Sequence, residues 1–109
     1  MKKMLVIVLV LLSFGCGNEI KTFSDNDIII DVRSSSEYKK EHIKNAQSLP
    51  LEEIEENISS VVKDKDAKIY VYCQSGTRSA IALTKLEELG YTNVENLGGI
   101  SDKFELEGE

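Results

Sequence analysis

The chain has 109 residues, a length suited to one domain, and a formal net charge of −6. Nucleic-acid binding depends on clustered lysine and arginine, so this acidic composition argues against a nucleic acid as the main partner. A single proline and seven glycines are typical of an ordered globular chain.

The first sixteen residues have the layout of an export signal. Two lysines precede nine apolar residues, 4–12, and SFGCG follows as a small-residue processing site. Nine helical residues extend about 14 Å, which is too short for a bilayer core of about 30 Å. We therefore expect residues 1–16 to be a signal peptide and the protein to be exported to the periplasm or cell envelope.

Cys16 ends this segment within LLSFGCG, which resembles a bacterial lipobox. In that motif the cysteine becomes the lipidated first residue of the mature protein, so the favoured interpretation is a lipoprotein attached to the membrane through Cys16. Ordinary signal cleavage is the alternative. In either case two lysines leave with the signal, and 11 basic against 19 acidic residues give the mature chain a charge of −8.

The next segments predict a tether, a strand and a helix. Residues 17–27 are polar and rich in turn formers, and we interpret them as a tether to a domain at residues 28–109. The β-branched run DIIIDV, 27–32, predicts a buried strand. Ser34 and Glu37 have the spacing of a capping box, which predicts a short helix, and an extended NAQSLP segment follows.

A second helix is expected over residues 51–62, where apolar side chains recur at helical spacing. The stripe predicted to be buried comprises Leu51, Ile54, Ile58, Val61 and Val62. Glutamates occupy positions 52, 53, 55 and 56. We interpret this acidic cluster as a solvated helix face near a helix N-terminus, and the alternative is a metal or partner site.

The strongest strand pattern in the chain is KIYVYC, residues 68–73. A third helix is expected over residues 77–89, with Gly90 as the residue that stops it. NVENLGG then predicts a short strand and a glycine turn, and a last short helix is expected in ISDKFELEGE. This alternation predicts an α/β fold with a mainly parallel central sheet and helices on both faces. Sites in such folds lie at the carboxyl ends of the strands.

Cys73 ends the strongest strand, and the loop QSGTR leads from it into the third helix. Gly76 can adopt a positive φ, so the loop N–H groups can curl inward and, with the helix N-terminus, hold negative charge. A cysteine in such a place commonly has a lowered pKa, and Arg78 adds a positive charge that can bind an oxyanion. With Cys16 lipidated, Cys73 has no disulfide partner. The alternative is a buried cysteine that merely ends a core strand.

Other chemistries have less support in the sequence. The only histidine, His42, lies near the end of the first predicted helix, where we expect it to cap or pack rather than act as a base for the cysteine. No second cysteine and no histidine pair lies near Cys73, so we expect no metal site.

Four motifs in chain order, DVR, EYKKEHIKNAQSLP, CQSGTRS and NLGGI, resemble those of single-domain rhodaneses, a family of sulfurtransferases. The likeness covers residues 28–100 and is greatest to small exported rhodaneses of the phage-shock periplasmic type. The chain departs from the family pattern in four ways: no tryptophan follows the glycine pair, EHI replaces the usual GHI, KNA lacks the usual glycine, and the usual first strand and helix before IDVR are mostly missing, as in the short exported type. These departures leave the cysteine loop intact, so they bear on the acceptor more than on the reaction.

The resemblance implies that Cys73 accepts a sulfane sulfur from thiosulfate or a related donor, becomes a persulfide, and passes the sulfur to cyanide or a thiol, including a protein thiol. The amides that surround this sulfur belong to Gln74, Ser75, Gly76, Thr77 and Arg78. Asp31 and Arg33 match supporting residues near the site. Gly98 and Gly99 match a turn beside it. A monomer without a cofactor is expected.

Two other functions remain as alternatives. Tyrosine phosphatases and arsenate reductases have five residues between cysteine and arginine, whereas four separate Cys73 from Arg78. The shorter loop fits one sulfur better than a phosphate, which favours sulfur transfer. The other alternative is a non-catalytic exported module that carries a persulfide or binds a partner. A charge of −8 does not attract dianionic thiosulfate, and only Arg33, Arg78 and the loop amides offset it, so a neutral or protein-borne persulfide is an alternative donor.

Overall fold

A computed structural model describes residues 19–109 of the chain. Its elements are β1 (Ile28–Asp31), α1 (Ser35–Lys40), β2 (His42–Ile43), β3 (Gln47–Ser48), the 3₁₀ helix η2 (Leu51–Glu53), α2 (Ile54–Val61), β4 (Ile69–Cys73), α3 (Thr77–Glu88), β5 (Val94–Gly99) and β6 (Leu106–Glu107). The predicted signal peptide, including Cys16, lies outside the described residues. Among residues 19–109, no helix has the length and apolar character needed to span a membrane.

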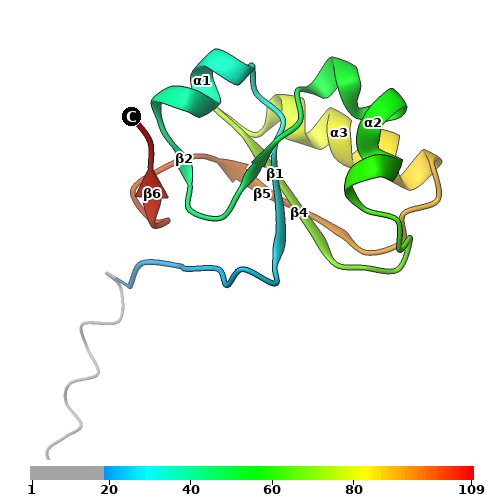
Figure 1. Ribbon diagram of the computed structural model, residues 1–109, viewed down its shortest axis with the longest axis horizontal. Helices are drawn as coiled ribbons and strands as arrows, with labels where there is room; N and C mark the ends of the chain where they lie inside the picture. The colour runs from blue at the N-terminus through cyan, green and yellow to red at the C-terminus, as the bar shows by residue number, and fades with distance from the viewer. Residues whose placement is uncertain (1–18) are drawn as a thin grey trace, which may run out of the picture.

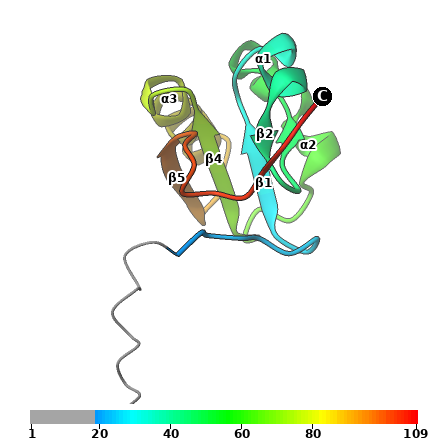
Figure 2. The same cartoon turned by 90° about the vertical axis from the view of Figure 1, so that its left-hand side faces the viewer.

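The central sheet contains four parallel strands in the order β3-β1-β4-β5. Its strands β1, β4 and β5 are labelled in Figure 1. β1 and β4 lie in the middle of the sheet because both are runs of β-branched and aromatic residues that tolerate burial on both faces. Their register pairs Ile28 with Ile69 and Asp31 with Tyr72, so the two strands end at the same edge. From that edge the chain continues into α1 and α3, which lie at the same end of the sheet (Figure 2). The predicted α/β fold with a mainly parallel sheet is confirmed.

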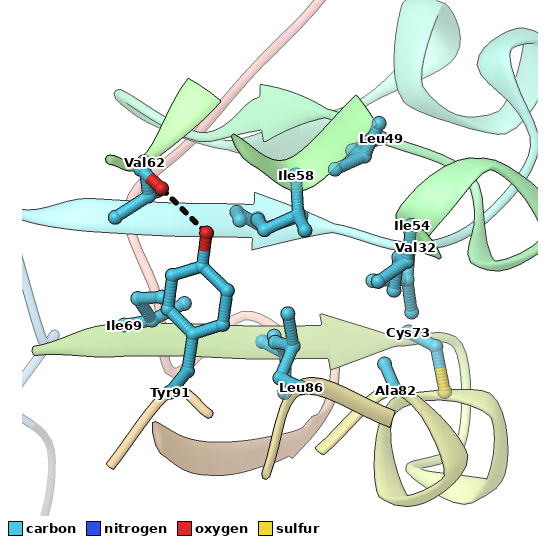
Figure 3. Packing of buried hydrophobic residues seen from close by; sticks show 12 residues of the cluster. Val32, Leu49, Ile54, Ile58, Val62, Ile69, Cys73, Ala82, Leu86 and Tyr91 are labelled. Atoms are coloured by element: carbon cyan, nitrogen blue, oxygen red, sulfur yellow. Dashed lines mark hydrogen bonds between the residues drawn. The ribbon is translucent and has the colours of Figure 1, made fainter. Parts of the chain in front are cut away.

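Side chains alternate across the sheet and feed two hydrophobic clusters. The first cluster lies between the sheet and the helices α2 and α3, and it includes Cys73 beside Ala82 and Leu86 (Figure 3). The second cluster lies on the opposite face, where Tyr72 packs with Tyr38 of α1. Helices therefore contribute to both faces, and Cys73 belongs to the face that α3 covers.

The two helices before β4 follow their predictions closely. The capping box is present: the Glu37 N–H donates to Ser34 Oγ at 3.3 Å, and the Ser34 N–H donates to Glu37 Oε1 at 3.1 Å. The second helix begins as the 3₁₀ turn η2 and continues as α2. All four of its glutamates are exposed, as expected of a solvated face.

One residue of the predicted buried stripe is at the surface. Val61 is 36% exposed, so its assignment to the core was wrong, whereas Ile54, Ile58 and Val62 are buried. The reason is that α2 ends at Val61, and Val62 adopts an extended conformation that turns its side chain into the core in place of Val61.

The glycines after α3 have two different roles. Gly90 follows the helix with a φ of 100°, which agrees with its prediction as the stop residue. The glycine turn predicted after residues 93–97 is instead the end of β5, which continues through Gly99. Asn96 pairs with Val71 and Gly98 with Tyr72, so Leu97 is an extra residue in a β-bulge that the φ of 90° at Gly98 permits.

The predicted C-terminal helix is wrong. Leu106 and Glu107 form β6, which pairs antiparallel with β2, and Phe104 and Leu106 alternate with polar residues so that both pack on the second cluster. Lys21 forms a parallel bridge with Phe104, and Phe23 packs on the same cluster. Both come from the segment that the sequence analysis interprets as a tether.

Candidate active site

Cys73 is the last residue of β4, and its sulfur faces the first turn of α3 (Figure 3). The residue is 1% exposed, beneath a loop whose Gln74 and Ser75 are exposed. Its Sγ accepts hydrogen bonds from the Gly76 N–H at 3.0 Å and the Ser79 N–H at 3.4 Å. The Ser79 hydroxyl lies 3.5 Å from the same sulfur. The loop and helix N-terminus predicted to hold negative charge thus converge on one atom.

This environment lowers the pKa of the Cys73 thiol. Burial alone raises it, but hydrogen bonds from the Ser79 hydroxyl and from the N–H groups of Ser79, Ser75 and Gly76 outweigh burial and lower the pKa from 9.0 to about 7. A substantial fraction of the thiol is therefore the nucleophilic thiolate at neutral pH.

The Ser79 hydroxyl is fixed by Asn96 of β5, and neither residue has a role predicted from the sequence. Ser79 Oγ donates to Asn96 Oδ1 at 2.7 Å and lies 3.1 Å from the Gly76 carbonyl. Asn96 Oδ1 also accepts from the Gly98 N–H at 2.8 Å, and its amide donates to the Gly76 carbonyl at 3.3 Å. The role of Ser79 could have been predicted from the sequence, because Ser79 lies in the first turn of the predicted helix, directly after the cysteine loop. Asn96 approaches the sulfur only through the pairing of β4 with β5.

The glycine pair of β5 lies directly against the cysteine loop, as its predicted place beside the site implies. A Cβ on Gly99 would lie 2.5 Å from the Gln74 carbonyl oxygen, so only glycine fits at that position. A Cβ on Gly76 would lie 3.3 Å from the Gly98 Cα, and Gly76 itself has a φ of 98°. The Ile100 N–H donates to the Cys73 carbonyl at 2.9 Å and holds the end of β4 in place.

Asp31 and Arg33 form a buried ion pair next to the loop. Arg33 donates to both carboxylate oxygens of Asp31, with the shortest distance 2.7 Å from Nη2 to Oδ2. Its Nη1 donates to Gln74 Oε1 at 3.3 Å. Tyr72 donates its hydroxyl to the same Asp31 oxygen at 2.7 Å. The predicted supporting pair therefore links the end of β1 to β4 and to the first loop residue.

Arg78 lies differently from the sequence expectation. Instead of a free charge directed at an oxyanion, its guanidinium forms two hydrogen bonds to the Glu37 carboxylate, 3.0 Å from Nη1 to Oε1 and 3.2 Å from Nη2 to Oε2. The hydrogen bond from Arg78 is the main reason that the pKa of Glu37 is lowered to about 2. Sequence reasoning identified Glu37 only as a capping residue, because its partner lies 41 positions away.

The remaining titratable candidates lie outside this arrangement. His42 stacks on Tyr38 with ring centroids 3.8 Å apart, and its Nδ1 lies 2.7 Å from the Tyr38 carbonyl oxygen. It therefore packs, as expected. Among the described residues, no group of three or more histidine, cysteine or acidic side chains is arranged to hold a metal ion.

Comparisons with known proteins agree with this geometry. The model of the rhodanese-like domain family matches residues 18–105. The thiosulfate sulfurtransferase PspE of Escherichia coli is 45% identical over 73 residues, which cover 67% of this chain and 70% of that protein. The uncharacterized protein YqhL of Bacillus subtilis is 35% identical over 71 residues, and the match covers 65% of this chain and 55% of YqhL.

The same relationship is found among solved structures. A rhodanese with anions from E. coli superposes with a TM-score of 0.72 at 39% sequence identity, and the match covers 76% of this chain and 99% of that one. The chain belongs to the rhodanese-like domain family, as its motifs predicted, and its fold is the rhodanese-like α/β fold.

Proposed function

We propose that this protein is a sulfurtransferase that carries a sulfane sulfur as a persulfide on Cys73. The observation that supports this most directly is that the Gly76 and Ser79 N–H groups donate to one buried sulfur, that the Ser79 hydroxyl lies 3.5 Å from it, and that the thiol pKa is lowered to about 7. Membership of the rhodanese-like family, and the similarity to a thiosulfate sulfurtransferase, support the same reaction class.

The proposed reaction has two steps. The Cys73 thiolate attacks the outer sulfur of thiosulfate or a related donor, the donor S–S bond breaks, and sulfite leaves with its electron pair. The N–H groups of Gly76 and Ser79 donate to Sγ and stabilise the attacking thiolate, and the amides of the loop then stabilise the terminal sulfur of the persulfide, as donors in an oxyanion hole stabilise oxygen. A thiolate or cyanide attacks that sulfur, and Cys73 leaves as the thiolate. Gln74 to Arg78 form the loop around the sulfur, while Asp31 and Arg33 support it from β1.

Phosphatase or arsenate reductase chemistry fits this site less well. The loop has one residue fewer than the phosphatase pattern, and the guanidinium of Arg78 is bound to Glu37 rather than available to a tetrahedral oxyanion. The two N–H donors of the site both lie within hydrogen-bonding distance of the same sulfur atom. This arrangement suits a single sulfur better than a tetrahedral oxyanion.

We also propose that the enzyme is exported from the cytoplasm. The layout of residues 1–16 supports export to the periplasm or cell envelope, and Cys16 supports attachment through a lipid. A domain that acts as a monomer, with Phe23 of the segment before β1 packed on its second cluster, completes this proposal.

Steady-state kinetics with thiosulfate and cyanide test the proposal. A persulfide intermediate predicts parallel lines in double-reciprocal plots, because each substrate reacts with a different form of the enzyme. Intersecting lines would contradict a persulfide route. Phosphate release from an aryl phosphate without thiocyanate formation would favour the phosphatase alternative.

A further inference from the structure

Both arginines of the chain are already ion-paired next to the cysteine loop. The sequence contains only Arg33 and Arg78, and each lies against one carboxylate, Asp31 and Glu37 respectively. The positive charges that could offset the acidic character of the domain for an anionic donor are thus cancelled within the site. The groups that remain to stabilise a negatively charged sulfur are the N–H groups of Gly76 and Ser79.

Glu37 is held in this position by two separate sets of contacts. Its Oε1 accepts from the N–H and the hydroxyl of Ser34 at 3.1 and 3.0 Å, which closes the capping box of α1. Both carboxylate oxygens also accept from Arg78, which lies in the first turn of α3. Because α1 and α3 follow adjacent strands, the pair joins α1 to the first turn of α3, which faces the sulfur.

Arg78 lies next to the atoms that bind the sulfur. It precedes Ser79 in the first turn of α3, and the Ser79 N–H donates to Cys73 Sγ at 3.4 Å. The side chains of Arg78 and Glu37 are 39% and 34% exposed, so an approaching donor meets both charges, weakened by water.

We propose that Glu37 is a specificity-determining residue, which neutralises Arg78 and thereby favours sulfane donors with one negative charge or none over dianionic donors. This inference rests on the proposed sulfurtransferase function and names its preferred donor class. Such donors react by the same step: the thiolate attacks the outer sulfur, the S–S bond to the rest of the donor breaks, and that remainder leaves with the electron pair.

Two donors with the same leaving chemistry and different charge test this inference. Thiosulfate is a dianion that releases sulfite, and methanethiosulfonate is a monoanion that releases methanesulfinate. Glu37→Gln keeps an oxygen for the capping box but removes the charge, so the pair changes from neutral to +1. At low ionic strength we expect kcat/KM to rise roughly fivefold for thiosulfate and roughly twofold for methanethiosulfonate, since the electrostatic energy is proportional to the donor charge.

A charge series separates this role from a structural one. Arg78→Gln leaves residues 37 and 78 with a net charge of −1, so it should lower the ratio of thiosulfate to methanethiosulfonate kcat/KM. The double variant, Glu37→Gln with Arg78→Gln, has a neutral pair and should restore the wild-type ratio. Glu55→Gln is the matched control, because Glu55 pairs with Lys85 at 3.3 Å, about 12 Å along α3 from its first residue, and this variant should leave the ratio unchanged.

The outcomes distinguish the inference from the function on which it rests. The role of Glu37 is supported if the ratio of thiosulfate to methanethiosulfonate kcat/KM falls as the net charge of residues 37 and 78 changes from +1 to −1. The ratios of the variants should also become equal at high salt. Active variants with one common ratio overturn it and leave sulfur transfer intact. A wild-type protein that turns over neither donor overturns the proposed function, and the inference with it.

Discussion

At the scale of single residues, the chemistry of the site depends on a hydroxyl that has one proton and several acceptors. Ser79 Oγ lies within hydrogen-bonding distance of Cys73 Sγ, Asn96 Oδ1 and the Gly76 carbonyl. The contact with Asn96 Oδ1 is the shortest of the three, at 2.7 Å, so Asn96 sets the position of the hydroxyl. A thiolate at Cys73 competes with Asn96 Oδ1 for the hydroxyl proton, and it also accepts from the Ser79 N–H, which is why Ser79 contributes strongly to the low pKa of the Cys73 thiol.

Replacing Ser79 with alanine should therefore weaken the thiolate. In the wild-type protein the rate of alkylation by iodoacetamide should be half-maximal near pH 7 and fall about tenfold for each pH unit below it, because only the thiolate reacts. In Ser79→Ala the midpoint should move upward, toward the ordinary value of 9.0. Peptide mass spectrometry measures the rate at Cys73 separately from Cys16.

Thr84→Ala is the control for this change, because Thr84 also lies on α3 and its hydroxyl bonds only to the Ala80 carbonyl, at 3.3 Å. Its alkylation profile should match the wild type. An unchanged midpoint in folded Ser79→Ala protein would contradict the assigned role of the hydroxyl.

Sequence reasoning predicted the local part of the site and missed the part made by strand pairing. Cys73 and its loop are contiguous, so the end of a strand, a glycine and a helix start were enough to locate them. Asn96 and the Glu37 carboxylate reach the site through contacts between distant segments, 17 and 41 positions away from Ser79 and Arg78. No periodicity in a single sequence predicts such contacts.

At the scale of elements, Tyr72 joins three strands. Its side chain lies in the second cluster, where its hydroxyl donates to Asp31 Oδ2 at 2.7 Å and accepts from the Ile43 N–H at 3.0 Å. Burial is the main reason that the pKa of this tyrosine is raised, and the carboxylate of Asp31 adds to the shift. The hydroxyl is thus the link between β1, β4 and β2.

Tyr72→Phe should lower the free energy of unfolding by about 1–3 kcal/mol, because the Ile43 N–H is left buried without its acceptor and Asp31 loses one donor. Urea unfolding followed by circular dichroism measures this change. Tyr70→Phe, in the same strand but with a partly exposed side chain, should change stability by less than about 0.5 kcal/mol. Equal losses in the two variants would contradict the linking role.

The elements themselves were predicted with uneven success, and burial explains the difference. β1 and β4 are continuous apolar runs because they form the middle of the sheet, and α3 has an apolar stripe because one side of it packs on that sheet. β6 has two residues and is defined by its partner β2, so the local pattern of ISDKFELEGE was mistaken for a helix. Val61 was misplaced because a stripe of helical periodicity does not show where the helix ends.

At the scale of the whole molecule, segments from both ends of the described chain close the second cluster. The rings of Phe23 and Phe104 have centroids 6.3 Å apart, and Phe23 also lies 5.1 Å from Tyr70. The Lys21 N–H donates to the Lys103 carbonyl at 2.7 Å, and the Asn45 side chain donates to the Phe23 carbonyl at 2.7 Å. The segment before β1 therefore contributes to the packing of the domain.

A double-mutant cycle on Phe23→Ala and Phe104→Ala should show this contribution. Each single change should cost about 1–3 kcal/mol, less than a fully buried phenylalanine because both rings are partly exposed. Their coupling energy should be about 0.5–1.5 kcal/mol, since the two rings contact each other. Phe23→Ala combined with Leu86→Ala, from the first cluster, should be additive. Additivity in both pairs would contradict the contact between Phe23 and Phe104, and an unchanged free energy of unfolding in Phe23→Ala would mean that the N-terminal segment contributes nothing to the domain.

The measurement that tests the central claim most directly is the intact mass of the protein after incubation with thiosulfate. Wild-type protein should gain about 32 Da, one sulfur atom, and release one equivalent of sulfite, and cyanide should remove the added mass as thiocyanate. Cys73→Ser should gain nothing. An absent adduct in active, folded wild-type protein, or the same adduct in Cys73→Ser, would contradict a persulfide carried on Cys73.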